Sequence, residues 1–105
     1  MDKRLFVYIV NCDDDSYYTG VTNNVEKRVA EHNYGLDKKS FTYSRRPVKL
    51  VFSQEFSDYH EAIRFEKQVK GWSRAKKEAL IEGNIEKLVK LSNKKIIQYK
   101  KVILR

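Results

Sequence analysis

The sequence predicts a small α/β domain of the α+β type, in which a three-stranded, mostly antiparallel sheet is flanked by helices. Short apolar and β-branched runs alternate with turn residues near the N-terminus, and apolar stripes at helical spacing occupy the second half. The predicted order of elements is β-β-α-β-α-α-α, and packing helices on such a sheet buries the apolar face of each element. We expect one domain over residues 1–92, followed by a tail over 93–105 whose basic and aliphatic residues show no clear period.

The first two elements form a predicted β-hairpin. Residues 5–10 are a continuous apolar and β-branched run, typical of a strand buried on both faces. Residues 11–16 form a turn by composition, and residues 17–21 return as the second strand. Three aspartates of this turn lack the spacing of a metal site, and we interpret them as turn residues only: Asp13, Asp14 and Asp15.

A predicted helix follows the hairpin, with asparagines as N-cap candidates, and ends near Gly35. Its inward side carries Val25, Val29 and His32. Residues 36–47 show no periodicity and are predicted to be a loop, and residues 48–56 are predicted to be the third strand. The alternation in that strand predicts one face with Leu50, Phe52 and Gln54 and another with Val51, Ser53 and Glu55.

Three more helices are predicted after the third strand. Asp58 followed by Glu61 resembles a capping box, which opens the first of them. The apolar stripe of that helix consists of Ala62, Phe65, Val69 and Trp72. Residues 74–82 form the second helix, closed by Gly83. The third begins after Asn84 and has an inward face of Ile85, Leu88, Val89 and Ser92.

The net charge of +8 is unevenly distributed along the chain. Residues 36–105 carry 18 Lys and Arg against 8 Asp and Glu, whereas residues 1–35 carry 4 against 6. Basic charge concentrated on part of a small domain is typical of a protein that binds nucleic acid, although in many small proteins it serves only solubility. No apolar run approaches the roughly 20 residues of a membrane helix. The lone Cys12 cannot form an internal disulfide, so we expect a cytoplasmic protein.

Four residues in the first three elements are candidates for catalysis. Tyr8 and Tyr18 lie in adjacent antiparallel strands, which would place their hydroxyls within reach of one another. Arg28 and His32 are four residues apart on one helical face, so a guanidinium suited to phosphate would neighbour a group that moves protons. The alternative is that the tyrosines and the histidine are packing residues and that Arg28 is solvated.

Glu66 is the candidate metal ligand. It lies beside the apolar stripe of the long helix, within a basic stretch. Magnesium is often held by one or two carboxylates and keeps several waters, so one carboxylate suffices when substrate phosphate completes the shell. The alternative is an ordinary helical ion pair with Lys70, four residues further on.

Two basic stretches with interleaved aromatic residues are candidates for binding DNA phosphates, which give affinity but carry no sequence information. The first, around Phe41 and Tyr43, consists of Lys38, Lys39, Arg45, Arg46 and Lys49. The second, around Trp72, consists of Lys67, Lys70, Arg74, Lys76 and Lys77. The alternative for each stretch is a solvated charged surface.

Taken together, these residues resemble the GIY-YIG nuclease superfamily, and most closely its small single-domain bacterial branch, which is related to the N-terminal nuclease domain of an excinuclease. The resemblance runs from about residue 4 to residue 90. Phe6-Val7-Tyr8 stands at the GIY motif and Tyr18-Thr19-Gly20 at the YIG motif. Arg28 with His32 matches the catalytic-arginine helix, and Glu66 the metal-binding glutamate. The stretches 45–51 and 66–74 are similar to signatures of the small branch.

The resemblance implies a DNA endonuclease that uses one metal ion, Mg²⁺ or Mn²⁺, and acts in repair or recombination. It implies that the metal on Glu66 stabilises the leaving 3′ oxygen, that Arg28 neutralises developing charge, and that Tyr18 or Tyr8 deprotonates water, with His32 as the rival base. The chain departs from the family in three places, the last being that the asparagine many larger members carry after the glutamate helix has no clear match here. Phe6 and Val7 replace the Gly and Ile of the first motif, and Val21-Thr22 stands where many relatives have a lysine. The second departure shifts the role of base toward a tyrosine or the histidine.

Two other functions remain open on the sequence alone. One is a non-catalytic DNA-binding module on the same fold, which would bind DNA without cutting it. The other is a protein-interaction domain without salt-dependent affinity for DNA. The sequence does not indicate the DNA structure that is cut or the oligomeric state. Because the chain shows no separate specificity domain, we expect structure-selective cleavage or a protein partner that supplies specificity.

Overall fold

The computed structural model describes residues 4–92, so the predicted tail over 93–105 lies outside the described residues. The chain divides into two compact units, one ending at Lys70 and the other beginning at Gly71. The elements are β1 (Leu5–Asn11), β2 (Tyr17–Thr22), α1 (Val25–Tyr34), a 3-10 turn η1 (Tyr43–Arg45), β3 (Lys49–Phe56), α2 (Tyr59–Lys70), α3 (Arg74–Glu82) and α4 (Ile85–Ser92). The predicted fold class and order of elements are confirmed.

The three strands form one antiparallel sheet in the order β2-β1-β3, with β1 at its centre. Residues 12–16 join β1 to β2 as a tight turn, in which the Cys12 N–H donates to the Ser16 carbonyl over 2.8 Å. Asp14 accepts hydrogen bonds from Ser16 and from Arg45, and Asp15 has a positive φ of 67°. Within residues 4–92, no group of His, Cys, Asp and Glu side chains has the arrangement of a three-ligand metal site. The predicted turn at these residues is confirmed.

The predicted alternation in β3 is wrong at one position, because the strand contains a bulge. Ile9 pairs with Phe52, whereas Val10 pairs with Leu50, so Val51 is an extra residue on the β3 side. A bulge of this kind reverses the facing of the residues that precede it. Leu50 therefore lies on the face opposite to that of Phe52 and Gln54.

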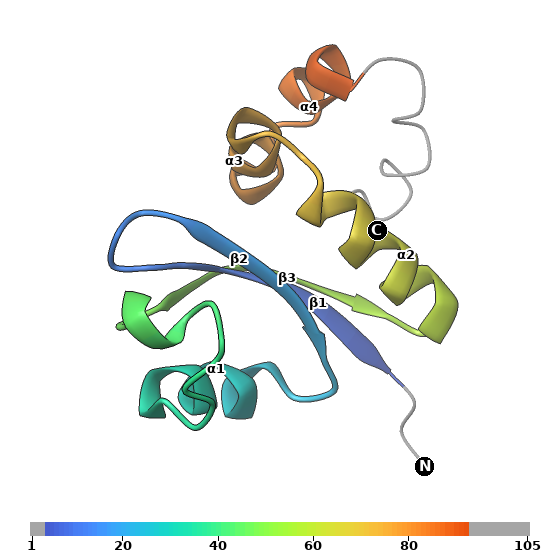
Figure 1. The fold of residues 1–105 in the computed structure, drawn as a ribbon. Helices are drawn as coiled ribbons and strands as arrows, with labels where there is room; N and C mark the ends of the chain where they lie inside the picture. The colour runs from blue at the N-terminus through green and yellow to red at the C-terminus, as the bar shows by residue number, and fades with distance from the viewer. Residues whose placement is uncertain (1–3, 93–105) are drawn as a thin grey trace. The chain divides into compact units, whose positions relative to one another are not determined.

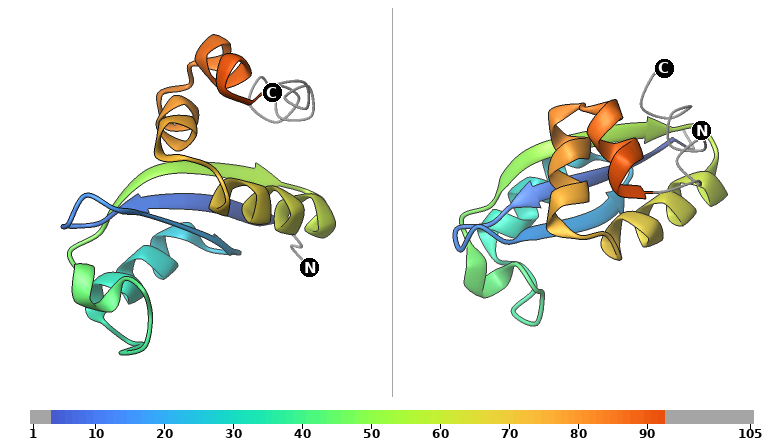
Figure 2. Two further views of the ribbon diagram at one scale, coloured as in Figure 1. Left: turned by 45° about the horizontal axis from the view of Figure 1, so that its top comes forward. Right: turned by 90° about the horizontal axis from the view of Figure 1, so that it is seen from above.

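The two faces of the sheet are covered by different helices. Figures 1 and 2 show α1 on one side of the sheet and α2 on the other. On the α2 side, Val7 and Ile9 of β1 are fully buried, and Phe56 packs on Phe65 of α2 with ring centroids 5.4 Å apart. On the α1 side, a second buried cluster consists of Tyr8, Val10, Cys12 and Val48, with Tyr18, Val25 and Val29 packed against it. The central strand β1 is thus buried on both faces, as its continuous apolar run predicts.

The second unit begins with a pair of helices whose predicted bounds are confirmed. Ser73 caps α3 by accepting a hydrogen bond from the Lys76 N–H, and Gly83 ends it with a positive φ of 71°. The Asn84 side chain accepts from the Lys87 N–H at the start of α4, and Leu88 is fully buried. No helix in residues 4–92 has both the length and the apolar character needed to cross a bilayer.

Candidate active site

Helix α1 positions Arg28 and His32 toward the sheet. Asn24 caps the helix by accepting from the Lys27 N–H, and Gly35 ends it in the left-handed conformation. Val25 and Val29 pack against the α1-side cluster, which fixes the helical face that approaches the strands. Because residues four apart lie on one helical face, Arg28 and His32 are held beside this packed stripe.

The two tyrosines are diagonal neighbours on the sheet. Tyr8 is paired with Gly20, and Tyr18 is paired with Val10, so the tyrosines lie on the same face and their ring centroids are 6.4 Å apart. The absence of a side chain at Gly20 makes room for the Tyr8 ring, because a Cβ there would lie 2.6 Å from the Tyr8 hydroxyl oxygen. The predicted proximity of the tyrosines is confirmed, although the residue directly opposite Tyr8 is the glycine.

His32 links the two elements. Its side chain is buried, its Nε2 lies 2.8 Å from the Tyr8 hydroxyl, and its Nδ1 lies 2.8 Å from Thr42 Oγ1. The Tyr18 ring meets the imidazole edge-on at 5.3 Å. Arg28 lies close enough to Tyr8 for its positive charge to act on the tyrosine, and it forms an ion pair with Glu31 at 3.2 Å. The structure therefore brings all four candidates of β1, β2 and α1 together.

Thr42 and its neighbour Ser40 are members of this cluster that the sequence pattern did not indicate. Thr42 is almost fully buried, and its hydroxyl lies 2.8 Å from the Ser40 hydroxyl. Both residues belong to the segment between α1 and β3, which has no periodicity from which an inward direction could be inferred. Their only signal was the presence of small hydroxyl residues in an otherwise basic and aromatic stretch.

The environment alters the pKa of two of these groups. Burial, together with the nearby Tyr18, raises the pKa of Tyr8 to about 12, although the nearby Arg28 acts in the opposite direction. Burial and then the charge of Arg28 lower the pKa of His32, against a smaller opposite effect of Glu31. At neutral pH the phenol is therefore protonated, whereas the imidazole is neutral and has a lone pair with which to accept a proton.

Glu66 reaches the same region from the other helix. It is buried in α2, and its carboxylate forms an ion pair with Lys70 at 2.7 Å. The Lys70 ammonium in turn lies 5.9 Å from the centre of the Tyr18 ring, and the charge of Glu66 contributes to the raised pKa of Tyr8. Because β2 is an edge strand, side chains of α2 can reach past it to the tyrosines. The ion pair with Lys70 is thus present, and it places the carboxylate beside the cluster.

The donor set around Glu66 fits one hard divalent cation. A single buried carboxylate provides an oxygen ligand, and the ammonium against it already marks the position as one that holds a cation. Mg²⁺ retains water molecules and accepts substrate phosphate as ligands, so further protein carboxylates are not required. Binding there would require Lys70, whose side chain is half exposed, to move away from the carboxylate.

The two arginines of the first basic stretch make intramolecular contacts. Arg45 lies over the Phe41 ring at 3.8 Å and forms an ion pair with Asp14 at 3.1 Å. Arg46 lies over the Tyr43 ring at 4.3 Å and donates to the Tyr43 carbonyl. The lysines of the stretch are exposed: Lys38, Lys39 and Lys49. DNA binding by this stretch remains a prediction, and exposure favours its lysines over its arginines for contact with phosphates.

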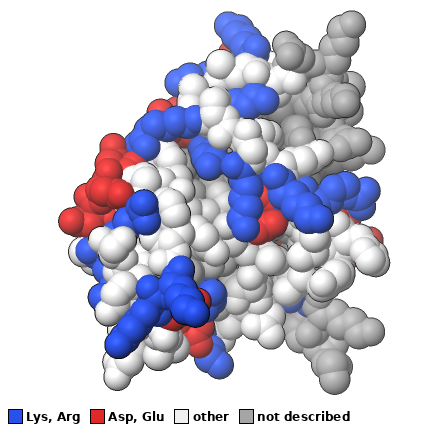
Figure 3. All heavy atoms as spheres, viewed as in Figure 1, with Lys and Arg blue, Asp and Glu red and all other residues white. Residues whose placement is uncertain are grey.

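The second basic stretch is divided between the two units. Lys67 and Lys70 belong to α2 of the first unit. In the second unit, Lys76 lies 5.5 Å from the Trp72 ring and Arg74 pairs with Glu78 at 3.2 Å, while burial lowers the pKa of Lys77. Carboxylates lie among the lysines and arginines on the face shown in Figure 3. DNA binding by these residues likewise remains a prediction.

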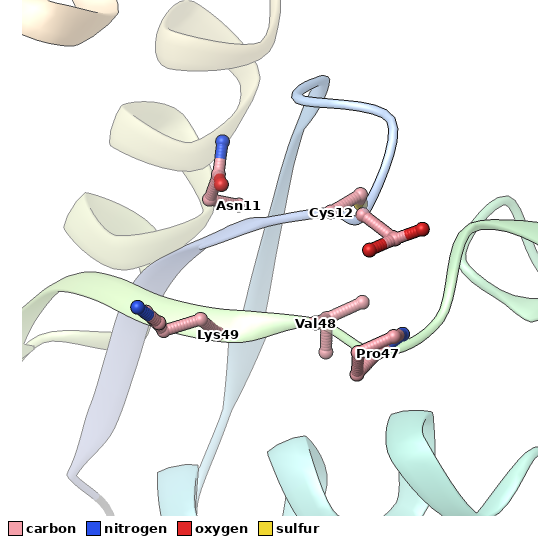
Figure 4. Close-up of a pocket in the computed structure, with 6 residues that line it drawn as sticks. Asn11, Cys12, Pro47, Val48 and Lys49 are labelled. Atoms are coloured by element: carbon pink, nitrogen blue, oxygen red, sulfur yellow. The ribbon is translucent and has the colours of Figure 1, made fainter.

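A pocket lies where the end of β1 meets the start of β3, as Figure 4 shows. It is lined by Asn11, Cys12, Asp13, Pro47, Val48 and Lys49, and none of the candidate catalytic residues lines it. Burial raises the pKa of the Cys12 thiol, which keeps it protonated and poorly nucleophilic at neutral pH. The candidate active site is therefore the tyrosine, arginine and histidine cluster with the adjacent carboxylate.

Comparison with known proteins identifies one family. The family model described as the GIY-YIG catalytic domain matches residues 4–79, which include every member of the candidate site. The UPF0213 protein SH2523 of Staphylococcus haemolyticus is 51% identical over 77 residues, which are 73% of this chain and 93% of that protein. The UPF0213 protein YazA of Bacillus subtilis is 47% identical over 77 residues, which are 73% of this chain and 77% of that protein.

A solved structure is also similar. The solution NMR structure of the UPF0213 protein BH0048 from Bacillus halodurans matches with a TM-score of 0.51 and 39% sequence identity. The match covers 87% of this chain and 99% of that one. The similarity in sequence therefore extends to the fold.

Proposed function

Because the chain belongs to the GIY-YIG family, we propose that it is an endonuclease that hydrolyses DNA phosphodiester bonds with the help of Mg²⁺ or Mn²⁺. The observation that carries this proposal is the hydrogen bond between Tyr8 and His32, with the charge of Arg28 acting on both and the carboxylate of Glu66 nearby. We assign it structure-selective cleavage in DNA repair or recombination in the cytoplasm. A protein partner would supply further specificity.

The contacts of Tyr8 and His32 support a path for a proton. A phenol is a stronger acid than a neutral imidazole N–H, and an imidazole nitrogen is a good acceptor, so the Tyr8 hydroxyl can donate its proton to His32 Nε2. A phenol with a pKa of about 12 is protonated at neutral pH and cannot act as a base unless its proton leaves. In the proposed step, water transfers a proton to the Tyr8 oxygen while Tyr8 passes its own proton to His32.

The remaining groups act on the phosphate. The hydroxide formed from water attacks phosphorus, the bond from phosphorus to the 3′ oxygen breaks, and that oxygen takes a proton from solvent. Arg28 lies beside Tyr8, where its fixed positive charge would stabilise the charge that builds up on the phosphoryl oxygens. A metal ion held by Glu66 would supply Lewis-acid stabilisation of the leaving oxygen. Tyr18 packs against His32 and would hold its ring in place.

Nicking of supercoiled plasmid tests this function. We expect the wild-type protein to nick with Mg²⁺ or Mn²⁺ and to stop when a chelator is added. Glu66→Gln should lower the rate by at least about 100-fold, because the neutral amide does not replace a metal-binding carboxylate. Glu61→Gln is the matched control, since Glu61 is an exposed carboxylate in the same helix, and it should keep the wild-type rate.

Two outcomes would contradict the proposal. If Glu66→Gln cut DNA at the wild-type rate, the metal role of this carboxylate would be wrong. If the folded wild-type protein bound branched and linear DNA but cut neither with either metal, a non-catalytic DNA-binding module would be the correct function. Thermal unfolding followed by circular dichroism would establish that each variant is folded.

A further inference from the structure

The His32 side chain belongs to a longer chain of hydrogen bonds that continues away from the tyrosine. His32 Nδ1 lies 2.8 Å from Thr42 Oγ1, and Thr42 Oγ1 lies 2.8 Å from Ser40 Oγ. Ser40 Oγ also accepts the backbone N–H of Thr42 over 3.1 Å. Thr42 is almost fully buried, so its hydroxyl is held in this arrangement away from solvent. The hydrogen bonds thus run without a break from Tyr8 to Ser40.

The direction of these hydrogen bonds follows from the acidity of the first two members of the chain. A phenol is a stronger acid than a neutral imidazole N–H, and an imidazole nitrogen accepts better than a phenol oxygen, so the Tyr8 proton points to His32 Nε2. A neutral imidazole that accepts at Nε2 carries its proton on Nδ1 and donates it to Thr42. The Thr42 hydroxyl, having accepted from His32, donates to Ser40, whose oxygen has lone pairs for both this proton and the Thr42 N–H. With these directions, every donor in the chain of hydrogen bonds has an acceptor.

We propose that Thr42, supported by Ser40, is a positioning residue that keeps the proton of His32 on Nδ1 and so leaves Nε2 free to receive the proton of Tyr8. This inference rests on the proposed function, because it concerns the proton path of the same site. It also assigns a second role to the segment between α1 and β3. Besides carrying exposed lysines, the segment provides the buried Thr42 hydroxyl that sets the histidine tautomer. Neither residue would contact substrate.

The tautomer of His32 is measurable without any activity. Long-range proton–nitrogen NMR spectra of the imidazole, recorded at a pH at which His32 is neutral, distinguish a proton on Nδ1 from one on Nε2. The chain has 2 histidines, and the exposed His60 is an internal control. We expect the Nδ1–H form of His32 in the wild-type protein and a shift of about tenfold toward Nε2–H in Thr42→Val, the equivalent of one hydrogen bond. Thr42→Ser keeps the hydroxyl and should keep the wild-type tautomer, and Ser40→Ala should shift it partly.

Plasmid nicking by the same variants completes the test. We expect Thr42→Val to cut at least about tenfold more slowly than wild type and Thr42→Ser to restore most of the rate. An Nε2–H tautomer in the wild-type protein, or an unchanged tautomer in both Thr42→Val and Ser40→Ala, would overturn the inference. A shifted tautomer with a wild-type rate in Thr42→Val would also overturn it, while leaving the proposed function intact. If the tautomers behave as expected but the wild-type protein does not cut DNA, the proposed function fails instead.

Discussion

Substitution of Gly20 by alanine tests whether the packing of Tyr8 depends on a missing side chain. A Cβ at this position would lie 2.6 Å from the Tyr8 hydroxyl oxygen, 2.7 Å from Cζ and 2.9 Å from Cε1, whereas ordinary contacts begin at 3.4 Å. The three atoms belong to a rigid side chain that is 1% exposed and bonded to His32, so the ring cannot turn away at little cost. Gly20→Ala must therefore displace the ring by nearly an ångström or move the strands apart.

The expected magnitude follows from this crowding. Overpacking of a buried site costs about 1–3 kcal/mol of unfolding free energy. For a chain of 105 residues this corresponds to a lowering of Tm by roughly 5–14 °C. Urea unfolding of the wild type, Gly20→Ala, Tyr8→Val and the double variant would measure the interaction between the two positions. In the Tyr8→Val background the alanine meets no ring, and replacing a strand glycine should then be neutral or stabilising by about 0.5–1 kcal/mol.

One outcome of the double-mutant cycle would contradict this explanation. If Gly20→Ala had the same cost with and without the Tyr8 ring, the packing of the ring against the glycine backbone would not be the reason for that cost. Such a result would also remove the physical explanation for how the second motif of the family positions the tyrosine of the first.

The other predictions concern the electrostatics and hydrogen bonds around the site. Lys70→Met removes the ammonium 2.7 Å from Glu66 and should tighten Mn²⁺ binding by about threefold in a titration, whereas Lys67→Met on the same helix should leave the affinity unchanged. If Lys70→Met bound Mn²⁺ with the wild-type affinity, Lys70 would not compete with the metal for Glu66. Because burial lowers the pKa of His32, unfolding free energy should fall as pH drops below about 6.5, where the unfolded state binds a proton first. His32→Gln should reduce that slope in urea unfolding between about pH 7.5 and 5.5, and an unchanged slope would contradict the assignment. The Asn33 side chain is hydrogen-bonded to the N–H and the carbonyl of Val48, over 2.7 and 3.0 Å. Asn33→Ala should therefore lower the unfolding free energy by about 1–3 kcal/mol in urea unfolding, and an unchanged value would show that these hydrogen bonds do not stabilise the fold.

The order and bounds of the elements were predictable because local signals mark them. The α3 helix was predicted over residues 74–82 because a serine precedes it and a glycine follows it, and both act as caps in the structure. The facing of β3 was not predictable beyond Phe52. A bulge at Val51 adds one residue to one strand, and no turn residue or break in the β3 sequence marks its position.

The candidate site was predictable where its members lie on regular elements. Register brings Tyr8 and Tyr18 together, and helical spacing brings Arg28 and His32 together. The contact of His32 with Thr42 was not predictable, because it joins a helix to an irregular segment. Charge patterning likewise gave the positions of the basic residues but not their partners, so the intramolecular contacts of Arg45 and Arg46 were missed.

One measurement tests the central claim most directly: cleavage of labelled DNA by Tyr8→Phe. This variant removes a single oxygen and keeps the ring against Gly20, so the fold and the DNA surface are preserved. We predict that single-turnover cleavage with Mg²⁺ falls by about 100-fold or more while DNA affinity, measured by fluorescence anisotropy, stays within about twofold of wild type. Cleavage at the wild-type rate by the folded variant would contradict the claim that the Tyr8 hydroxyl carries the proton of the attacking water.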